Sequence, residues 1–223
     1  MSDWPLRHEM VDIARRMHAR GYVAASDGNL SCRAPGNAIL VTASGTHLGE
    51  LTPDDIVRVS PDGRVTAGTR RPSSELPLHL EVYRRRADVQ AVVHAHPPTA
   101  TAFTFAGVSM AECVIPEVVL TLGTIPTAPY ATPGSAEGPA AIGALIVEHD
   151  AVLLERHGSV TVGRSLSDAY YKLEKLEHAA HVLLVARQLG RVISLSRDEL
   201  TKIAQVRERL GLGSMTDVWK YCR

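Results

Sequence analysis

The chain has 223 residues, and 45% of them are hydrophobic, which is enough for the core of one large domain or two small ones. Lys plus Arg and Asp plus Glu number 24 each, so the formal net charge is zero and no field of the whole protein attracts nucleic acid or an anionic membrane. No linker or repeat divides the chain, and we interpret residues 1–223 as a single domain.

Three features of the sequence indicate a reducing, aqueous compartment. The first residues lack the basic-then-apolar pattern of a signal peptide, and no apolar run is long enough to cross a bilayer. Cys32, Cys113 and Cys222 lie far apart and have no CxxC spacing, so we expect reduced thiols rather than a disulfide framework or a thiolate zinc site. We therefore expect a soluble, cytoplasmic protein.

The N-terminal third predicts a helix followed by antiparallel strands. Apolar residues recur at steps of three and four before Gly21, which is a suitable residue just beyond a helix end. Asp62-Gly63 accepts the positive φ values of a tight hairpin turn. The expected elements are a helix over 4–20, a polar turn over 26–31, a strand over 38–42, and a hairpin of 56–60 with 65–67.

The rest of the chain alternates between strand and helix patterns. We expect helices over 76–86, 99–106, 136–148, 165–189 and 197–210, and strands over 89–93 and 151–154. Ser165 or Ser167 can cap the longest helix, which Gly190 ends, and Gly211 and Gly213 mark the end of the last one. Residues 117–122 are ambiguous. The alternation indicates an α/β protein with a three-layer α/β/α sandwich.

A carboxylate followed by a histidine pair is the strongest chemical signal. Glu75 precedes His94-Ala-His96 by about twenty residues, and two imidazoles at spacing two reach one side of a strand or strand end. His157 ends a second strand-like run and is the best third ligand. Histidines without metal are common, but an all-histidine set with one carboxylate suits a catalytic divalent ion, first Zn²⁺ and otherwise Mn²⁺ or Co²⁺.

Three short segments together suggest an anion site. Gly28-Asn29, Ser44-Gly45 and Ser73-Ser74 each combine small residues or hydroxyls with a backbone that a ligand can approach closely. Each segment alone is an ordinary turn or helix cap, because Gly, Asn and Ser dominate turns. Only their convergence would make a phosphate site.

Six motifs in order resemble the class II aldolase/adducin family, closest to L-fuculose-1-phosphate aldolases, over nearly the whole chain. The motifs are Gly28-Asn-Leu-Ser31, Thr42-Ala-Ser-Gly45, Pro72-Ser-Ser-Glu75, Val92-Val-His-Ala-His96, Ala128-Pro-Tyr-Ala-Thr132 and His157-Gly158. The resemblance implies a class II aldolase-like sandwich with a largely antiparallel sheet. It also implies a homotetramer with active sites at subunit interfaces.

The resemblance also assigns roles to residues. His94, His96 and His157 would be the metal ligands, and Glu75 would be the catalytic carboxylate, which also ligates metal when substrate is absent. The substrate-phosphate positions would be Gly28, Asn29, Ser44, Gly45, Ser73 and Ser74.

These residues suit a metal-dependent aldolase that cleaves a ketose 1-phosphate to dihydroxyacetone phosphate and an aldehyde. Cleavage leaves negative charge that a metal stabilises as a Lewis acid, and Glu75 would move the proton at C3 with a raised pKa. A pentulose-phosphate 4-epimerase, a sugar-acid-phosphate decarboxylase and a methylthioribulose-1-phosphate dehydratase could use the same site. A non-catalytic adducin-like binding module would lose the ligands, which this chain retains.

One segment departs from the fuculose-phosphate pattern. Those enzymes carry a tyrosine between the histidine pair and the Ala-Pro-Tyr-Ala-Thr motif, whereas residues 115–122 contain none. Glu117 and Tyr221 are possible substitutes, although either could be an ordinary surface or packing residue. A deoxy or methylthio pentulose 1-phosphate therefore joins fuculose 1-phosphate as a candidate substrate. We interpret His79, one turn after Glu75, as a packed helix residue, with support of the site as the alternative.

Overall fold

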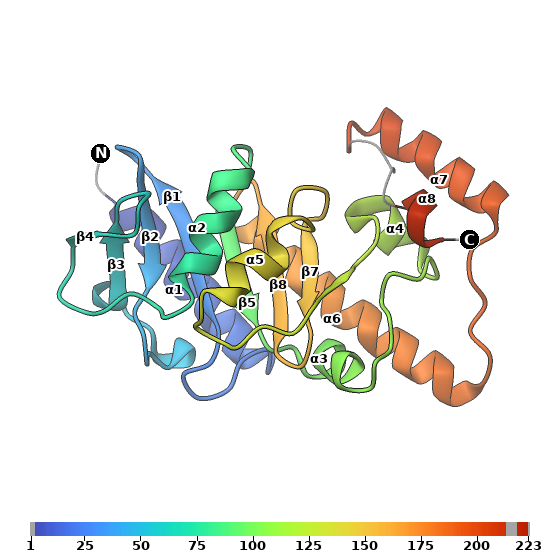
Figure 1. The fold of residues 1–223 in the computed structure, drawn as a ribbon, viewed down its shortest axis with the longest axis horizontal. Coiled ribbons are helices and arrows are strands. Elements are labelled where there is room, and N and C mark those ends of the chain that lie inside the picture. Colours follow the sequence, from blue (N-terminus) through green and yellow to red (C-terminus); the bar gives the residue numbers. More distant parts are fainter. Residues whose placement is uncertain (1–2, 213–217, 223) are drawn as a thin grey trace.

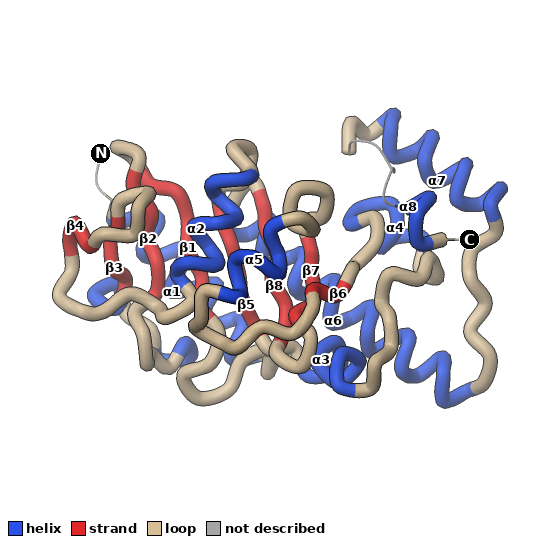
Figure 2. Tube along the Cα trace, viewed as in Figure 1, coloured by secondary structure: helices blue, strands red, loops and turns tan. Residues whose placement is uncertain are grey.

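The computed structural model describes residues 3–212 and 218–222, and a single sheet forms its centre. The strand order is β4-β3-β2-β1-β5-β8-β7-β6 from one edge to the other (Figure 2). The strands are β1 (Asn29–Ala34), β2 (Ala38–Thr42), β3 (Ile56–Val59), β4 (Val65–Ala67), β5 (Ala91–Ala95), β6 (Thr127–Ala128), β7 (Ala151–Leu154) and β8 (Gly158–Gly163). Neighbouring strands pair antiparallel except β6 and β7, so the prediction of a largely antiparallel sheet is confirmed.

Helices cover both faces of the sheet. They are α1 (Trp4–Ala19), α2 (Leu76–Arg85), α3 (Pro98–Phe105), α4 (Pro116–Leu122), α5 (Glu137–Gly143), α6 (Leu166–Leu189), α7 (Arg197–Arg209) and α8 (Val218–Tyr221). Figure 1 shows α2 and α5 on the near face and α1 and α6 on the far face. Val92 packs under α2 and α5, while Val93 packs under α1 and α6, because successive side chains of a strand point to opposite faces. This is the predicted three-layer sandwich.

Several predicted boundaries agree with the structure. Helix α1 ends just before Gly21, whose φ of +71° favours glycine, and the predicted strand over 38–42 is β2. The Ser165 side chain, not that of Ser167, caps α6 by accepting a hydrogen bond from the Asp168 N–H. The ambiguous residues 117–122 belong to helix α4, and the predicted role of Gly213 lies outside the described residues. Within the described part of the chain, no helix has the length and apolar character of a membrane span.

Three strands are absent from the prediction: the two-residue strand β6, and β1 and β8. The sequence predicts a polar turn over 26–31, but Asn29 already begins β1, and its side chain and that of Ser31 are buried. The sequence assigns no strand to Gly158–Gly163, which forms β8 between β5 and β7. The glycines at its ends permit close packing, because a Cβ on Gly158 would collide with His96 and one on Gly163 with the backbone of helix α6.

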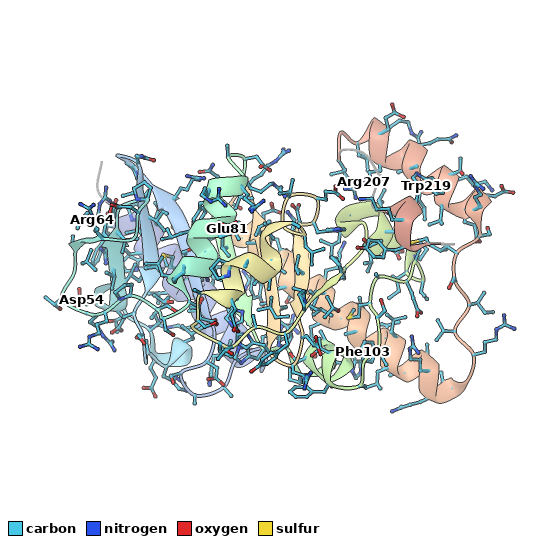
Figure 3. The ribbon with its side chains drawn as sticks, viewed as in Figure 1. Asp54, Arg64, Glu81, Phe103, Arg207 and Trp219 are labelled. Atoms are coloured by element: carbon cyan, nitrogen blue, oxygen red, sulfur yellow. A yellow bond between two sulfur atoms is a disulfide. The ribbon has the colours of Figure 1, made fainter. Side chains whose placement is uncertain are left out.

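A cluster of short helices forms the end of the molecule on the side of β6. Figure 1 shows α4, α7 and α8 together there, and Figure 3 places Arg207 and Trp219 within this cluster. Arg207 links α7 to α4 by donating from its guanidinium to the Leu120 carbonyl at 2.8 Å. Cys113 and Cys222 form a disulfide that attaches α8 to the segment before α4, so the prediction of reduced thiols is wrong for this pair. Cys32 is a free, buried thiol.

Candidate metal and catalytic site

Three histidines lie close together where the ends of adjacent strands meet. His94 lies within β5, His96 follows that strand, and His157 lies in the turn between β7 and β8. Because β8 pairs with both β5 and β7, this turn lies beside the end of β5. One nitrogen atom from each ring lies within 4.8 Å of the others. The fold thus brings together the three residues that the sequence selects as metal ligands.

The ring nitrogens point towards a common centre. His94 Nδ1 lies 3.0 Å from the carbonyl oxygen of Ser159, which can only accept, so this nitrogen donates and leaves Nε2 for another partner. His94 Nε2 lies 3.0 Å from His96 Nε2. Two nitrogens on a tetrahedral zinc ion, each at its usual bond length, stand about 3.3 Å apart. The observed spacing therefore fits a shared divalent ion.

Glu75 lies at the N-terminus of helix α2 and completes this arrangement from the helical layer on one face of the sheet. Its carboxylate oxygens lie 2.8 Å from His94 Nε2 and 3.7 Å from His157 Nε2. Asn29 Nδ2 donates to the same carboxylate at 3.3 Å. A nitrogen lone pair and a carboxylate that face each other repel unless a positive charge lies between them, either a proton or a metal ion. The donor set of three imidazoles and one carboxylate therefore fits a metal site with catalytic chemistry.

The pKa of Glu75 differs from the sequence-based expectation. Burial raises the pKa of Glu75, but the hydrogen bond and charge of His94 and the charge of His157 outweigh burial and bring it below its ordinary value. The expected raised pKa is therefore wrong for this state of the site. The physical reason is that two imidazoles next to the carboxylate stabilise its charged form more than burial disfavours it.

His96 is held by its backbone and stays neutral. Its N–H donates to the Tyr22 carbonyl at 2.9 Å, and its Nδ1 lies 3.7 Å from Asp27 Oδ2. Burial, together with the charges of His94 and His157, lowers the pKa of His96 to about 3. A neutral imidazole is the form that binds a metal ion.

The three segments of the predicted anion site lie next to one another. The Ser44 N–H donates to the Arg71 carbonyl, and the Ser73 N–H donates to the Thr42 carbonyl, which joins the second and third segments. The side chain of Asn29 reaches the same place through Glu75. The contributing side chains differ in access, because Ser44 and Ser74 are exposed whereas the buried Ser73 hydroxyl accepts from the Glu75 N–H.

The glycines of this region have different functions in the fold. A Cβ on Gly45 would meet no atom within 4 Å, and its φ is +70°, so this residue leaves open space beside Ser44. A Cβ on Gly28 would instead lie 2.5 Å from Val23 Cγ1 and 3.0 Å from the His94 carbonyl. Gly28 is therefore required for close packing against the strand that carries the histidines, a reason that its turn-like sequence does not reveal.

A pocket beside the histidines includes residues that the sequence analysis did not assign to the site. It is lined by Ser74, Glu75 and His157 and by the loop 129–135, which includes Thr132 and Gly134. The sequence signal was the Ala-Pro-Tyr-Ala-Thr motif, which identified the family without indicating a position in space. This loop lines the pocket together with Glu75 and His157.

The two candidates for the absent tyrosine do not line this pocket. Tyr221 lies in α8 with its ring centre 6.3 Å from that of His149, just before β7 begins, whereas His157 follows the other end of that strand. Glu117 lies in the first turn of α4. His79 is fully buried in α2 and hydrogen-bonds Ser31, which agrees with its interpretation as a packed helix residue.

Comparison with known proteins identifies the family. The profile of the Class II Aldolase and Adducin N-terminal domain matches residues 8–184. The chain is 35% identical over 184 residues to a 3-oxo-tetronate 4-phosphate decarboxylase of Escherichia coli, with 81% of this chain and 86% of that protein covered. It is 35% identical over 181 residues to an L-fuculose phosphate aldolase of Methanococcus maripaludis, with 81% and 97% covered.

The fold is similar to solved structures of the same kind. An L-fuculose 1-phosphate aldolase superposes with a TM-score of 0.86 at 26% sequence identity, and the match covers 93% of this chain and 98% of the other. Relatives named as aldolases or decarboxylases support a lyase activity. The chain belongs to the class II aldolase and adducin family.

Proposed function

We propose that the protein is a divalent-metal-dependent aldolase that cleaves a ketose 1-phosphate to dihydroxyacetone phosphate and an aldehyde. The observation that carries this proposal is the convergence of three imidazoles and the Glu75 carboxylate beside a pocket. The proposed substrate resembles fuculose 1-phosphate or a deoxy or methylthio pentulose 1-phosphate. The relatives named L-fuculose phosphate aldolase support a phosphorylated sugar.

The metal would be held by His94, His96 and His157. We propose Zn²⁺ as the ion, with Mn²⁺ or Co²⁺ as the alternatives. When bound, a divalent ion supplies Lewis-acid stabilisation of the negative charge that develops during carbon–carbon cleavage. The Ser159 carbonyl supports this arrangement because it fixes the tautomer and orientation of the His94 ring.

Glu75 would move the proton at C3 of the dihydroxyacetone phosphate portion. Its lowered pKa keeps it ionised at neutral pH, which is the form that removes this proton in the synthetic direction. In the cleavage direction the protonated carboxyl group would return the proton to C3. The hydrogen bond from Asn29 Nδ2 holds the carboxylate beside His94. Gly28, Asn29, Ser44, Gly45, Ser73 and Ser74 would surround the substrate phosphate.

Decarboxylation of a sugar-acid phosphate is the second candidate. Two observations favour it: the similarity to 3-oxo-tetronate 4-phosphate decarboxylases and the absence of tyrosine from residues 115–122. Loss of carbon dioxide from a 3-oxo acid also leaves negative charge beside a carbonyl, so the same histidines and Glu75 would be used.

A paired assay distinguishes the two reactions. Metal-loaded protein is supplied with a panel of ketose 1-phosphates and, separately, with 3-oxo-tetronate 4-phosphate, and dihydroxyacetone phosphate and carbon dioxide are measured. Our proposal predicts dihydroxyacetone phosphate from at least one ketose. Loss of carbon dioxide from 3-oxo-tetronate 4-phosphate itself leaves dihydroxyacetone phosphate, so the source of that product decides between the reactions. Equal amounts of carbon dioxide and dihydroxyacetone phosphate from the sugar acid, with no dihydroxyacetone phosphate from any ketose, would assign the second reaction. A protein that binds no metal and forms neither product would not be an enzyme of either kind.

The Glu75→Gln variant tests the role of the carboxylate. It should abolish turnover but retain metal through the three histidines, because Gln preserves the shape and removes the proton acceptor. Unchanged turnover would refute the role of Glu75. The single-domain organisation over residues 1–223, the homotetramer with sites at subunit interfaces and the cytoplasmic location stay predictions, and light scattering would measure the assembly.

A further inference from the structure

Helix α2 is joined to strand β1 by a row of polar contacts, which we call the α2 ladder. Asn29 contacts Glu75, Ser31 contacts both His79 and Tyr83, and Arg33 donates from its guanidinium to the Tyr83 carbonyl at 2.8 Å. The Ser31 hydroxyl lies 2.7 Å from His79 Nδ1 and 2.8 Å from the Tyr83 hydroxyl. The ladder therefore begins at Glu75, which belongs to the candidate catalytic site.

The spacing of the ladder follows from the geometry of the two elements. Asn29, Ser31 and Arg33 are alternate residues of a strand, and alternate residues are about 6.7 Å apart on one face. On the helix side, residues four apart rise by about 6.0 Å and lie on one side. These two repeats are similar in length, so Glu75 lies over Asn29 when His79, one repeat further along, lies over Ser31.

Burial makes this register hard to change. Ser31 and His79 have no exposed surface, and Tyr83 is 6% exposed. A shift of α2 along β1 would separate these buried polar groups from their partners, and a buried polar group without a partner is costly. Burial and the charge of His94 lower the pKa of His79 to about 3, so the ring is a neutral hydrogen-bonding group. The ladder thus acts as a fixed spacer between α2 and the sheet.

Glu75 responds to the position of α2 because it lies at the N-terminus of this helix. Its carbonyl accepts from the N–H groups of Leu78 and His79, which fixes its backbone to the first turn. Its carboxylate lies 2.8 Å from His94 Nε2 across the interface between helix and sheet. A displacement of the helix changes this distance directly.

We propose that His79 is a positioning residue that, through Ser31, holds the Glu75 carboxylate at the metal-binding histidines. This inference rests on the proposed role of Glu75. His79 itself contacts neither the substrate nor the metal. The proposal gives a function to a residue that otherwise only packs within the interface.

Three variants test this inference. His79→Leu removes the hydrogen bond to Ser31 and keeps an apolar side chain in the space, whereas His79→Asn returns a polar group near the position of Nδ1. Thr161→Val is the matched control, because the Thr161 hydroxyl is also buried and donates to the Ala169 carbonyl at 2.9 Å, on the α6 side of the sheet. Urea unfolding establishes that each variant is folded before other measurements.

The direct readout is the visible spectrum of the Co²⁺-loaded protein, which depends on the ligands around the ion. We expect His79→Leu to shift the spectrum towards that of Glu75→Gln and to lower kcat at least about tenfold with little change in KM. His79→Asn should recover most of the wild-type spectrum and rate. Thr161→Val should retain both, even if its stability falls as far as that of His79→Leu.

The outcomes separate this inference from the proposed function. A wild-type spectrum and kcat in His79→Leu, while Glu75→Gln alters both, would overturn the positioning role alone. Equal loss of rate in Thr161→Val and His79→Leu would also overturn it, because general destabilisation would explain both. Identical Co²⁺ spectra in wild type and Glu75→Gln, with turnover unchanged, would remove Glu75 from the site and overturn both its proposed role and this inference, whereas the turnover itself would still support the proposed function.

Discussion

Substitution of Gly158 by alanine should disrupt the metal site without removing any proposed ligand. Gly158 begins β8 directly after His157, and its partner strand β5 leads to His96. A Cβ at this position would lie 2.6 Å from His96 Cδ2 and would also collide with the Ala95 carbonyl. The nearby backbone cannot move independently, because the His96 N–H is bound to Tyr22.

The size of the effect follows from the missing space. Carbon atoms in favourable contact are at least about 3.5 Å apart, so the His96 ring must move by about 0.9 Å. Metal–ligand distances tolerate shifts of only about 0.2 Å. His96 would therefore leave the ion, and we expect metal affinity to fall at least about 100-fold, with a stability loss of about 1–3 kcal/mol from overpacking.

The assay is titration of metal-free protein with Zn²⁺ in competition with a chromophoric chelator, together with urea unfolding. Gly138→Ala is the control, because its Cβ would meet only Leu78 Cδ1 at an ordinary 3.7 Å within helix α5. That variant should bind metal like wild type and gain up to about 1 kcal/mol of stability. Wild-type Zn²⁺ affinity in Gly158→Ala would refute the placement of His96 at the ion.

Two further predictions concern charged groups away from the histidines. Asp150 pairs with Arg86 and Lys172, and although burial raises its pKa, these cations lower it below the ordinary value. The stability from these pairs is thus present above about pH 4 and is lost as pH falls through the folded-state pKa. Asp150→Asn should therefore lower the free energy of unfolding by about 2 kcal/mol at pH 7. In acid denaturation curves the difference in stability between this variant and wild type should shrink as the pH falls. Glu177 accepts both N–H groups offered by the first turn of α3, and Glu177→Ala should lower stability by about 2 kcal/mol in urea, compared with less than about 1 kcal/mol for the surface-paired Glu174→Ala. Equal effects of Glu177→Ala and Glu174→Ala would contradict this capping role.

The sequence predicts the outer layers of the fold well because amphipathic periodicity is local. Helix α1 has a pattern set by one buried face, and strand β2 is a short apolar run that is buried throughout, so the bounds of both follow from local sequence. Local pattern also predicts that the histidines lie at the ends of strands, where polar residues of neighbouring strands can meet. The order of strands that makes His157 a neighbour of His94 is a tertiary property, which periodicity does not contain.

Two of the three strands that the sequence misses, β1 and β8, share a physical cause. In β1 the alternate residues Asn29, Ser31 and Arg33 are polar and predict exposure, yet they meet polar partners on α2. In β8 the terminal glycines predict a loop, yet they are needed for close contact with neighbouring backbone. A polar or glycine residue can thus be buried when a specific partner is present, and that partner is invisible in a single segment of sequence.

The disulfide illustrates a different limit. Cys113 and Cys222 are separated by 109 residues, and nothing near either residue indicates the other. Their proximity depends on helix α7 returning along α4, where Arg207 meets the Leu120 carbonyl. The absence of a CxxC motif excludes a local metal site but not a long-range bond.

The central position of β5 has a consequence for the order of folding. His94 is the register partner of Asn29 on one side and of Val160 on the other, so the histidine cluster exists only after strands that are distant in sequence have paired. Such non-local pairing is the slow part of folding. A metal ion would then bind the finished sheet and not its precursors, and binding to the native state alone shifts the folding equilibrium towards it. The ion would stabilise the part of the protein that forms last. The rate at which the metal-bound protein unfolds would then depend on how often the central strands of its sheet separate.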